Sequence, residues 1–109
     1  MAENKEYMTK ELENGAISVN EDVLTTIALA AVKDVEGVVS LKNDKKGLHV
    51  TLGEDSVEVE CALVVLYGHS VMEIAKNVQN AVTNAIESMT GFKVTCVDVN
   101  VSGISMGKL

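Results

Sequence analysis

Arginine is absent from this chain of 109 residues, and all nine basic residues are lysine. The planar fork that grips a phosphate through two parallel hydrogen bonds is therefore missing. The 16 acidic residues give a net charge of −7, whereas a nucleic-acid binder usually carries a basic patch. The lysine cluster Lys42, Lys45 and Lys46 falls in an expected hairpin turn. We interpret it as solvated surface.

Aromatic residues are scarce, and proline and tryptophan are absent. Tyr7, Tyr67 and Phe92 are the whole aromatic content, so the chain is poor in the stacking groups that readers of single-stranded nucleic acid use. The hydrophobic 47% is mainly aliphatic, and the length is that of one domain with its own core. No run approaches the roughly 20 apolar residues that span a bilayer.

We expect no secretion signal in this chain, and its two cysteines form no recognisable framework. Residues 1–14 are polar, without the apolar stretch of a signal peptide. Cys61 and Cys96 stand singly in apolar strands. We therefore expect a cytoplasmic protein with both thiols reduced, and we expect any association with a membrane to go through a partner.

No set of residues has the arrangement that catalysis or metal binding needs. His69 precedes Ser70, but Ser70 is expected to cap a helix, and no acidic residue is placed to orient the imidazole. His49 is expected at the surface, and Cys61 and Cys96 on opposite sides of the sheet, whereas zinc needs three or four converging ligands. We predict no catalytic residue, no bound cofactor and no metal, and hence a protein that is not an enzyme.

The first expected helix covers residues 19–33. Ser18 with Glu21 three positions later forms a capping-box pattern, which starts such a helix. Its main apolar stripe consists of Val23, Ile27, Ala30 and Ala31. Leu29 and Val32 lie off this stripe. We expect these two to contact a partner protein or, as the alternative, the second helix.

Three antiparallel strands are expected next, at residues 38–41, 48–52 and 57–67, joined by tight turns. The outward positions at the end of the third strand are apolar, namely Ala62, Val64 and Leu66. A sheet face that meets water is usually polar in an antiparallel sheet. We therefore expect something to cover these three side chains.

The second expected helix covers residues 71–89 and has one apolar face through five turns. Ser70 with Glu73 forms its capping box, and Gly91 is a natural left-handed cap. Its opposite face carries the asparagines Asn77, Asn80 and Asn84, although asparagine has low helix propensity. This stripe is interpreted as a contact for a partner, the alternative being simple tolerance of asparagine on a well-packed helix.

The final strand is expected over residues 93–101, with Val94 pointing away from the helices. The helix before it makes this strand parallel to the third strand, through a right-handed crossover. The fold class is α+β: two helices packed on one face of a four-stranded mixed sheet, in the order α-β-β-β-α-β. It fills one domain at residues 15–104, between a flexible arm at 1–14 and a tail at 105–109.

Six short motifs follow one another along the chain. They are Gly15-Ala16-Ile17-Ser18, Val35-Glu36-Gly37-Val38, Tyr67-Gly68, Asn77-Val78-Gln79, Met89-Thr90-Gly91-Phe92 and Val97-Asp98-Val99-Asn100-Val101-Ser102-Gly103-Ile104. As an ordered set they closely resemble the alkaline shock protein family, the small cytosolic envelope-stress-response domain of Gram-positive bacteria.

This resemblance implies a non-enzymatic interaction or scaffold protein in cell-envelope homeostasis, with no catalytic residues to transfer. It implies binding to a second copy, to a small membrane protein that anchors the chain, or to a lipid-metabolism enzyme. The alternatives are a small RNA-binding module, against which the acidic balance argues, and an accessory regulator of a metabolic enzyme.

Overall fold

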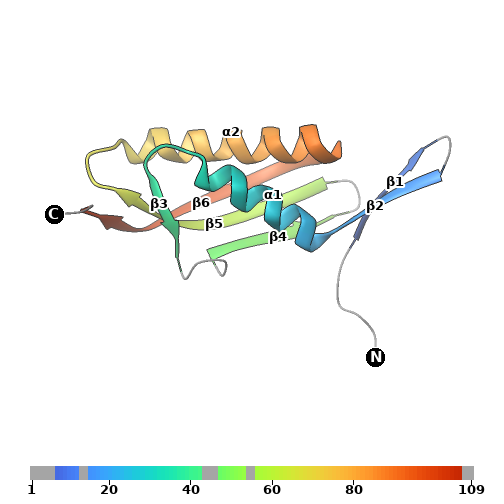
Figure 1. The fold of residues 1–109 in the computed structure, drawn as a ribbon, viewed down its shortest axis with the longest axis horizontal. Coiled ribbons are helices and arrows are strands. Elements are labelled where there is room, and N and C mark those ends of the chain that lie inside the picture. The colour runs from blue at the N-terminus through green and yellow to red at the C-terminus, as the bar shows by residue number, and fades with distance from the viewer. Residues whose placement is uncertain (1–6, 13–14, 43–46, 54–55, 107–109) are drawn as a thin grey trace, which may run out of the picture.

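The computed structural model describes residues 7–12, 15–42, 47–53 and 56–106. A sheet with two helices forms the body of the molecule, and a two-stranded hairpin precedes it (Figure 1). The elements in chain order are β1 (Tyr7–Leu12), β2 (Gly15–Asn20), α1 (Glu21–Lys33), β3 (Val38–Leu41), β4 (Leu48–Leu52), β5 (Ser56–Leu66), α2 (Val71–Thr90) and β6 (Lys93–Ser105).

β5 is the central strand of the main sheet and has neighbours along both edges. β3 and β4 pair antiparallel with its two halves on one edge, so that Leu41 lies opposite Leu63 and Leu48 opposite Cys61. β6 pairs in parallel along the other edge. The α+β class, the mixed four-stranded sheet and the order α-β-β-β-α-β are therefore confirmed from α1 to β6.

Both helices pack on the same face of this sheet, as predicted (Figure 1). α2 lies over β6, α1 lies over β3 and β4, and the helices contact each other. The inward side chains of β5 are all buried between the sheet and the helices, and they are Val57, Val59, Cys61, Leu63 and Val65. Burial of this aliphatic surface is the main force that holds the helices to the sheet.

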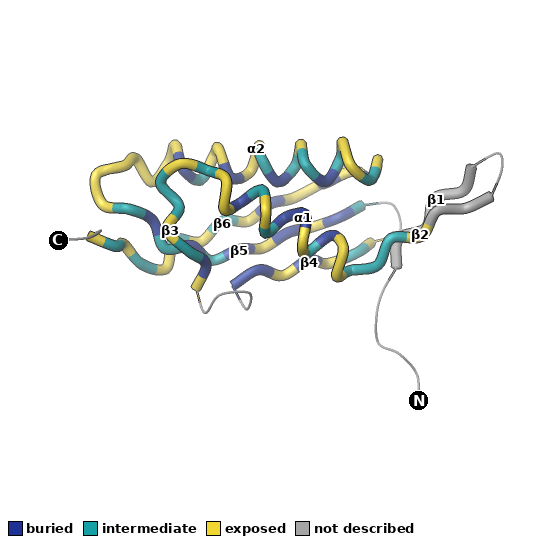
Figure 2. Tube along the Cα trace, in the orientation of Figure 1, coloured by how far each residue is buried: buried dark blue, intermediate teal, exposed yellow. Residues whose placement is uncertain are grey.

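α2 agrees with its sequence pattern at both ends and along its buried face. The Ser70 hydroxyl accepts a hydrogen bond from the Glu73 N–H at 3.3 Å, and Gly91 ends the helix with a φ of +80°. Its buried residues recur every four positions, which Figure 2 shows as an alternation along the helix, and they are Ile74, Val78, Val82 and Ile86.

α1 departs from its prediction at its start and in its buried face. Ser18 belongs to β2, and the cap is Asn20, whose side-chain oxygen accepts from the Val23 N–H at 3.1 Å. Of the predicted stripe, Ile27 is buried and Ala31 packs against the core, but Val23 and Ala30 are exposed, so the stripe is only partly correct. The buried residues are Leu24, Ile27, Ala28 and Val32. Large aliphatic side chains eight residues apart, with a small alanine between them, allow this face to approach the sheet closely.

The expected flexible arm at residues 1–14 contains a strand. β1 pairs antiparallel with β2, from Tyr7 opposite Asn20 to Leu12 opposite Gly15, and this hairpin projects beyond the main sheet (Figure 1). Residues 1–6 and 13–14 lie outside the described residues, as do Lys45 and Lys46 of the lysine cluster and residues 107–109. The division of the chain into an arm, one domain at 15–104 and a tail stays a prediction, although β6 continues to Ser105.

The start of β6 contains a bulge that the sequence pattern did not predict. The register against β5 shifts at Thr95, so Val94 and Val97 are both buried, and the prediction that Val94 points away from the helices is wrong. The Thr95 hydroxyl donates a hydrogen bond to the Val57 carbonyl at 3.5 Å. Side chains alternate between the two faces of a sheet, so one extra residue at Thr95 puts Val94 on the same face as Val97.

Candidate interaction surfaces

The sheet face opposite the helices has no second layer among the described residues, and its side chains divide into two parts. At the start of β5 they are charged: Glu58 and Glu60 are exposed, and Glu60 lies between Asp98 of β6 and His49 of β4. Farther along β5 they are apolar and half-buried between the neighbouring strands. This second part consists of Ala62, Val64 and Leu66, which we call the outer apolar strip.

The neighbours of the outer apolar strip leave it open. Val39 is at the irregular part of β3, where the pairing with β5 shifts, and is itself exposed. On the other side, Gly103 of β6 lies opposite Val64 and has no side chain to cover it. No element of the described part of the chain lies over this face, although the neighbouring strands leave the three side chains half-buried.

The two α1 residues that were predicted to contact a partner lie elsewhere. Val32 is 0% exposed and belongs to the core, so its interpretation as a partner contact is wrong. Leu29 is half-buried and packs against the core. Neither residue adjoins the outer apolar strip, because α1 covers the opposite face of the sheet. The error for Val32 arises because the predicted stripe left it out, whereas it lies on the buried face with Leu24 and Ala28.

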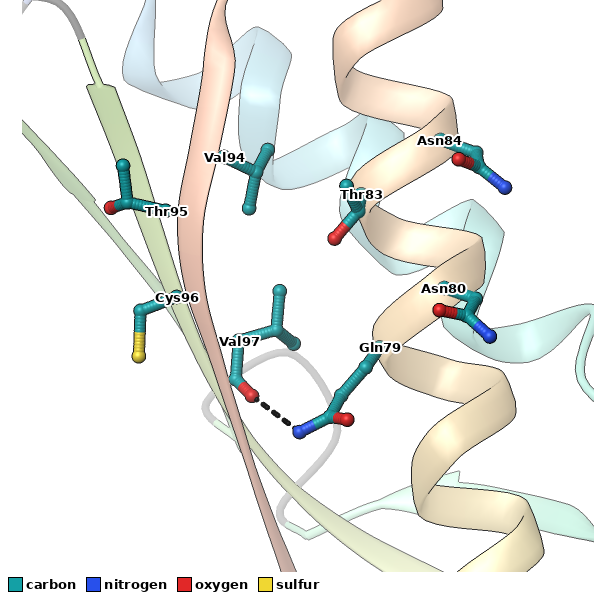
Figure 3. A pocket seen from close by; sticks show the side chains of 8 residues that line it. All are labelled: Gln79, Asn80, Thr83, Asn84, Val94, Thr95, Cys96 and Val97. Carbon is teal, nitrogen blue, oxygen red and sulfur yellow. Dashed lines mark hydrogen bonds between the residues drawn. The ribbon is translucent and has the colours of Figure 1, made fainter.

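The asparagine stripe borders a groove between α2 and β6, which has a volume of about 170 Å³ (Figure 3). Asn80 and Asn84 line this groove, whereas Asn77 does not. In Figure 3 both amides point away from β6 rather than across the groove. The remaining lining residues are Gln79, Thr83, Val94, Thr95, Cys96 and Val97. A partner contact through the three asparagines stays a prediction.

Two other α2 side chains, for which no contact was predicted, bond to the backbone of β6. The Gln79 amide donates to the Val97 carbonyl at 3.0 Å (Figure 3). The Glu87 carboxylate accepts from the Val94 N–H at 3.0 Å. Each satisfies a backbone group of β6 that no strand partner satisfies. Both residues resemble ordinary solvent-facing helix positions in the sequence, so only the placement of α2 over β6 reveals them.

Large apolar side chains, none of which was predicted to contact a partner, are also exposed at the end of the molecule where β5 leads into α2. They are Tyr67, Met72, Ile104 and Met106. The Tyr67 N–H donates to the Ser105 carbonyl at 2.8 Å, which ties this turn to the end of β6. One exposed apolar residue is ordinary, but a group of them marks a contact surface.

The titratable groups leave little scope for nucleophilic chemistry. Burial raises the pKa of the Cys61 thiol to about 11, and the charges of Asp98 and Glu60 act in the same direction. Cys96 is exposed, and its thiol donates to the Asp98 carboxylate at 3.4 Å, a bond that raises its pKa as well. Both thiols are therefore protonated at neutral pH, whereas the thiolate is the nucleophile.

The residues that the structure describes contain neither a cluster of metal ligands nor a helix that could span a membrane. No group of three or more His, Cys, Asp or Glu side chains in this part of the chain could hold a metal ion. Of the helices that the structure describes, none combines the length and the apolar character needed to cross a bilayer.

Comparison with known proteins assigns this α+β domain to a family. Residues 9–106 match the model of the alkaline shock protein 23 family, which is the alkaline shock protein family and is described by a cell envelope-related function. The chain belongs to this family, and the resemblance inferred from its motifs is confirmed. The uncharacterized protein YqhY of Bacillus subtilis (strain 168) is 24% identical over 104 residues, which cover 83% of this chain and 77% of YqhY. The uncharacterized protein Spy1535 of Streptococcus pyogenes serotype M6 is 31% identical over 102 residues, which cover 83% of this chain and 79% of Spy1535.

Solved structures share the fold. One structure of MamM-CTD superposes with a TM-score of 0.62 at 17% identity and covers 76% of this chain and 98% of that one. An identity this low shows the fold alone. The comparisons therefore support a cell envelope-related function and indicate no family of enzymes.

Proposed function

We propose that this protein is a non-enzymatic interaction protein of the cell-envelope response, and that it docks a protein partner on the outer apolar strip. The observation that supports this is the aliphatic character of Ala62, Val64 and Leu66 on a sheet face without a second layer among the described residues. Covering apolar surface stabilises a complex by roughly 25 cal/mol per Å² removed from water. The partner is a membrane-anchored protein or a lipid-metabolism enzyme, which would place this chain at the cytoplasmic side of the membrane.

Charges beside the strip favour one kind of partner. Glu58, Glu60 and Asp98 lie on the same face, at its other end. Carboxylates repel the phosphates of nucleic acids and of anionic lipids, and they attract lysine or arginine side chains. The proposed partner therefore carries aliphatic side chains next to basic ones. An RNA-binding role has no support on this face.

Complementation of a deletion strain under envelope stress tests the proposal. The test variant combines Val64→Asp with Leu66→Asp, which places two charges in the strip. The control is Met89→Asp, because Met89 is 70% exposed at the far end of α2. We expect the wild type and the control to restore growth, and the double variant to fail although it is folded by circular dichroism and normally abundant.

Growth restored by the double variant would remove the strip from the proposed function. Should this variant fail to fold, the milder pair Val64→Thr with Leu66→Gln replaces it, because threonine has nearly the shape of valine. Retained folding with lost complementation in that pair supports the proposal, and retained complementation contradicts it.

A further inference from the structure

β6 is an edge strand, and its side away from β5 pairs with no strand in the described part of the chain. Such an edge presents backbone N–H and C=O groups that another chain can pair with, so proteins usually block it. Here side chains of α2 cover only the first part of this edge, where Glu87 accepts from the Val94 N–H and Gln79 donates to the Val97 carbonyl. Between α2 and residues 98–104, no hydrogen bond is present among the described residues.

Met72 flanks the open part of this edge. It lies seven residues before Gln79, which is two helical turns, so both occupy the same side of α2. The contacts of Gln79 and Glu87 show that α2 runs antiparallel to β6. Met72 therefore lies about 10 Å beyond Gln79, a distance of about three strand residues, which places it over the region of Val101. Its side chain is 69% exposed.

A second bulge adds Ile104 to the same side. The alternation that turns Val99 and Val101 toward the helices would turn Ile104 toward the outer face. At Ser102 the register shifts by one residue, and Ile104 instead pairs with the buried Val65 and shares its helix-side face. Ile104 is nevertheless 56% exposed, because it lies beyond the cover of α2.

The strand itself carries no charge in the open part of the edge. Residues 99–106 contain neither an acidic nor a basic side chain, although the whole chain has a net charge of −7. Two copies related by a twofold axis can therefore bring their β6 strands together antiparallel without opposing like charges. The same contact covers Met72 and Ile104 on both copies at once, whereas a foreign strand would cover them on only one.

We infer that the protein forms a symmetric dimer in which the β6 edges pair antiparallel between Val99 and Ile104. Met72 and Ile104 of each copy pack against the other copy, and the two main sheets become one continuous sheet. The first part of each edge, closed by Gln79 and Glu87, limits the pairing to this stretch. The outer apolar strip stays open in both copies, so the dimer goes beyond the proposed function and presents two docking sites to a partner.

Sedimentation velocity over a thousandfold range of protein concentration tests the dimer. The wild type should reach twice the mass of one chain. Met72→Asp and Ile104→Asp should each raise the dissociation constant of the dimer at least about tenfold, because each substitution occurs twice in the symmetric interface. Met89→Asp is the matched control: Met89 is on the same helix and 70% exposed, and this variant should remain a dimer. All three positions are mostly exposed, so folding should survive, which circular dichroism checks.

Hydrogen exchange supplies the second measurement. The backbone amides of residues 99–104 should exchange more slowly at concentrations where the dimer forms than in dilute protein. Val64→Asp with Leu66→Asp should leave the dimer intact, so failure of this inference and failure of the proposed function are separable. A wild type that stays monomeric throughout overturns the inference. A dimer that both Met72→Asp and Ile104→Asp leave unchanged overturns it too.

Discussion

At the scale of single residues, Cys61 makes the stability of the protein depend on pH. Burial raises the pKa of this thiol from 9.0 to about 11. Between these values the unfolded chain loses the proton while the folded chain keeps it. The stabilising contribution of the protonated thiol is therefore complete below pH 9 and is lost as the pH rises to about 11. A shift of this size corresponds to roughly 2–3 kcal/mol.

Urea unfolding of the wild type and of Cys61→Ala, below pH 9 and near pH 11, measures this contribution. The free energy of unfolding of the wild type should fall by roughly 2–3 kcal/mol more than that of the variant. Lysine and tyrosine side chains titrate in both proteins, so the comparison removes their effect. An equal fall in both proteins would contradict the assignment to Cys61.

At the scale of elements, the joint between α1 and β3 depends on Gly37. Its φ is +96°, and a Cβ added there would lie 2.7 Å from Cδ1 of the buried Ile74 in α2. Gly68, between β5 and α2, has a similar φ of +100° but nothing within 4 Å of an added Cβ. Gly68→Ala should cost about 1–2 kcal/mol of stability for the backbone alone. Gly37→Ala should cost more, because Ile74 must also move.

Thermal or urea denaturation of these two variants separates the backbone cost from the packing cost. A larger loss for Gly37→Ala is the expected result. Equal losses would show that Ile74 adjusts without cost and that the joint does not depend on this contact.

The sequence predicts the ends and the buried face of α2 better than those of α1. α2 could be predicted because its buried residues recur every four positions and its ends have clear caps at Ser70 and Gly91. α1 carries aliphatic residues on most of its sides, so its sequence permits several buried faces. The sheet selects the face with Leu24 and Val32, and this choice rests on tertiary contacts that no local pattern records.

For the strands and surfaces too, local sequence patterns predict some features, while others depend on tertiary contacts. The outer apolar strip could be predicted because the alternation of β5 continues while its outward positions become apolar. The apolar alternation of β6 shifts by one residue near Thr95 and again near Ser102, but the sequence alone does not say which residue is the extra one. The pairing with β5 decides that. The contacts of Gln79 and Glu87, and the grouping of Met72 with Ile104, depend on these shifts and on the position of α2. They therefore required the structure.

At the scale of the whole molecule, the two candidate surfaces point in different directions. The outer apolar strip lies on the sheet face without helices, and the open part of β6 lies along one side of the sheet (Figure 1). A chain can use both at once, one for a partner and one for a second copy. The proposed contribution of the protein to the cell envelope then comes from binding.

Site-specific photo-cross-linking in growing cells tests this account most directly. A photoreactive residue replaces Val64 in one strain and Met89 in another, since Met89 is exposed at a distance from the strip. We predict a discrete cross-linked protein partner from position 64 that is absent from position 89 and is lost when Leu66→Asp is added. Identical cross-linking from both positions, or none from position 64, would contradict the claim that the protein works through its outer sheet face.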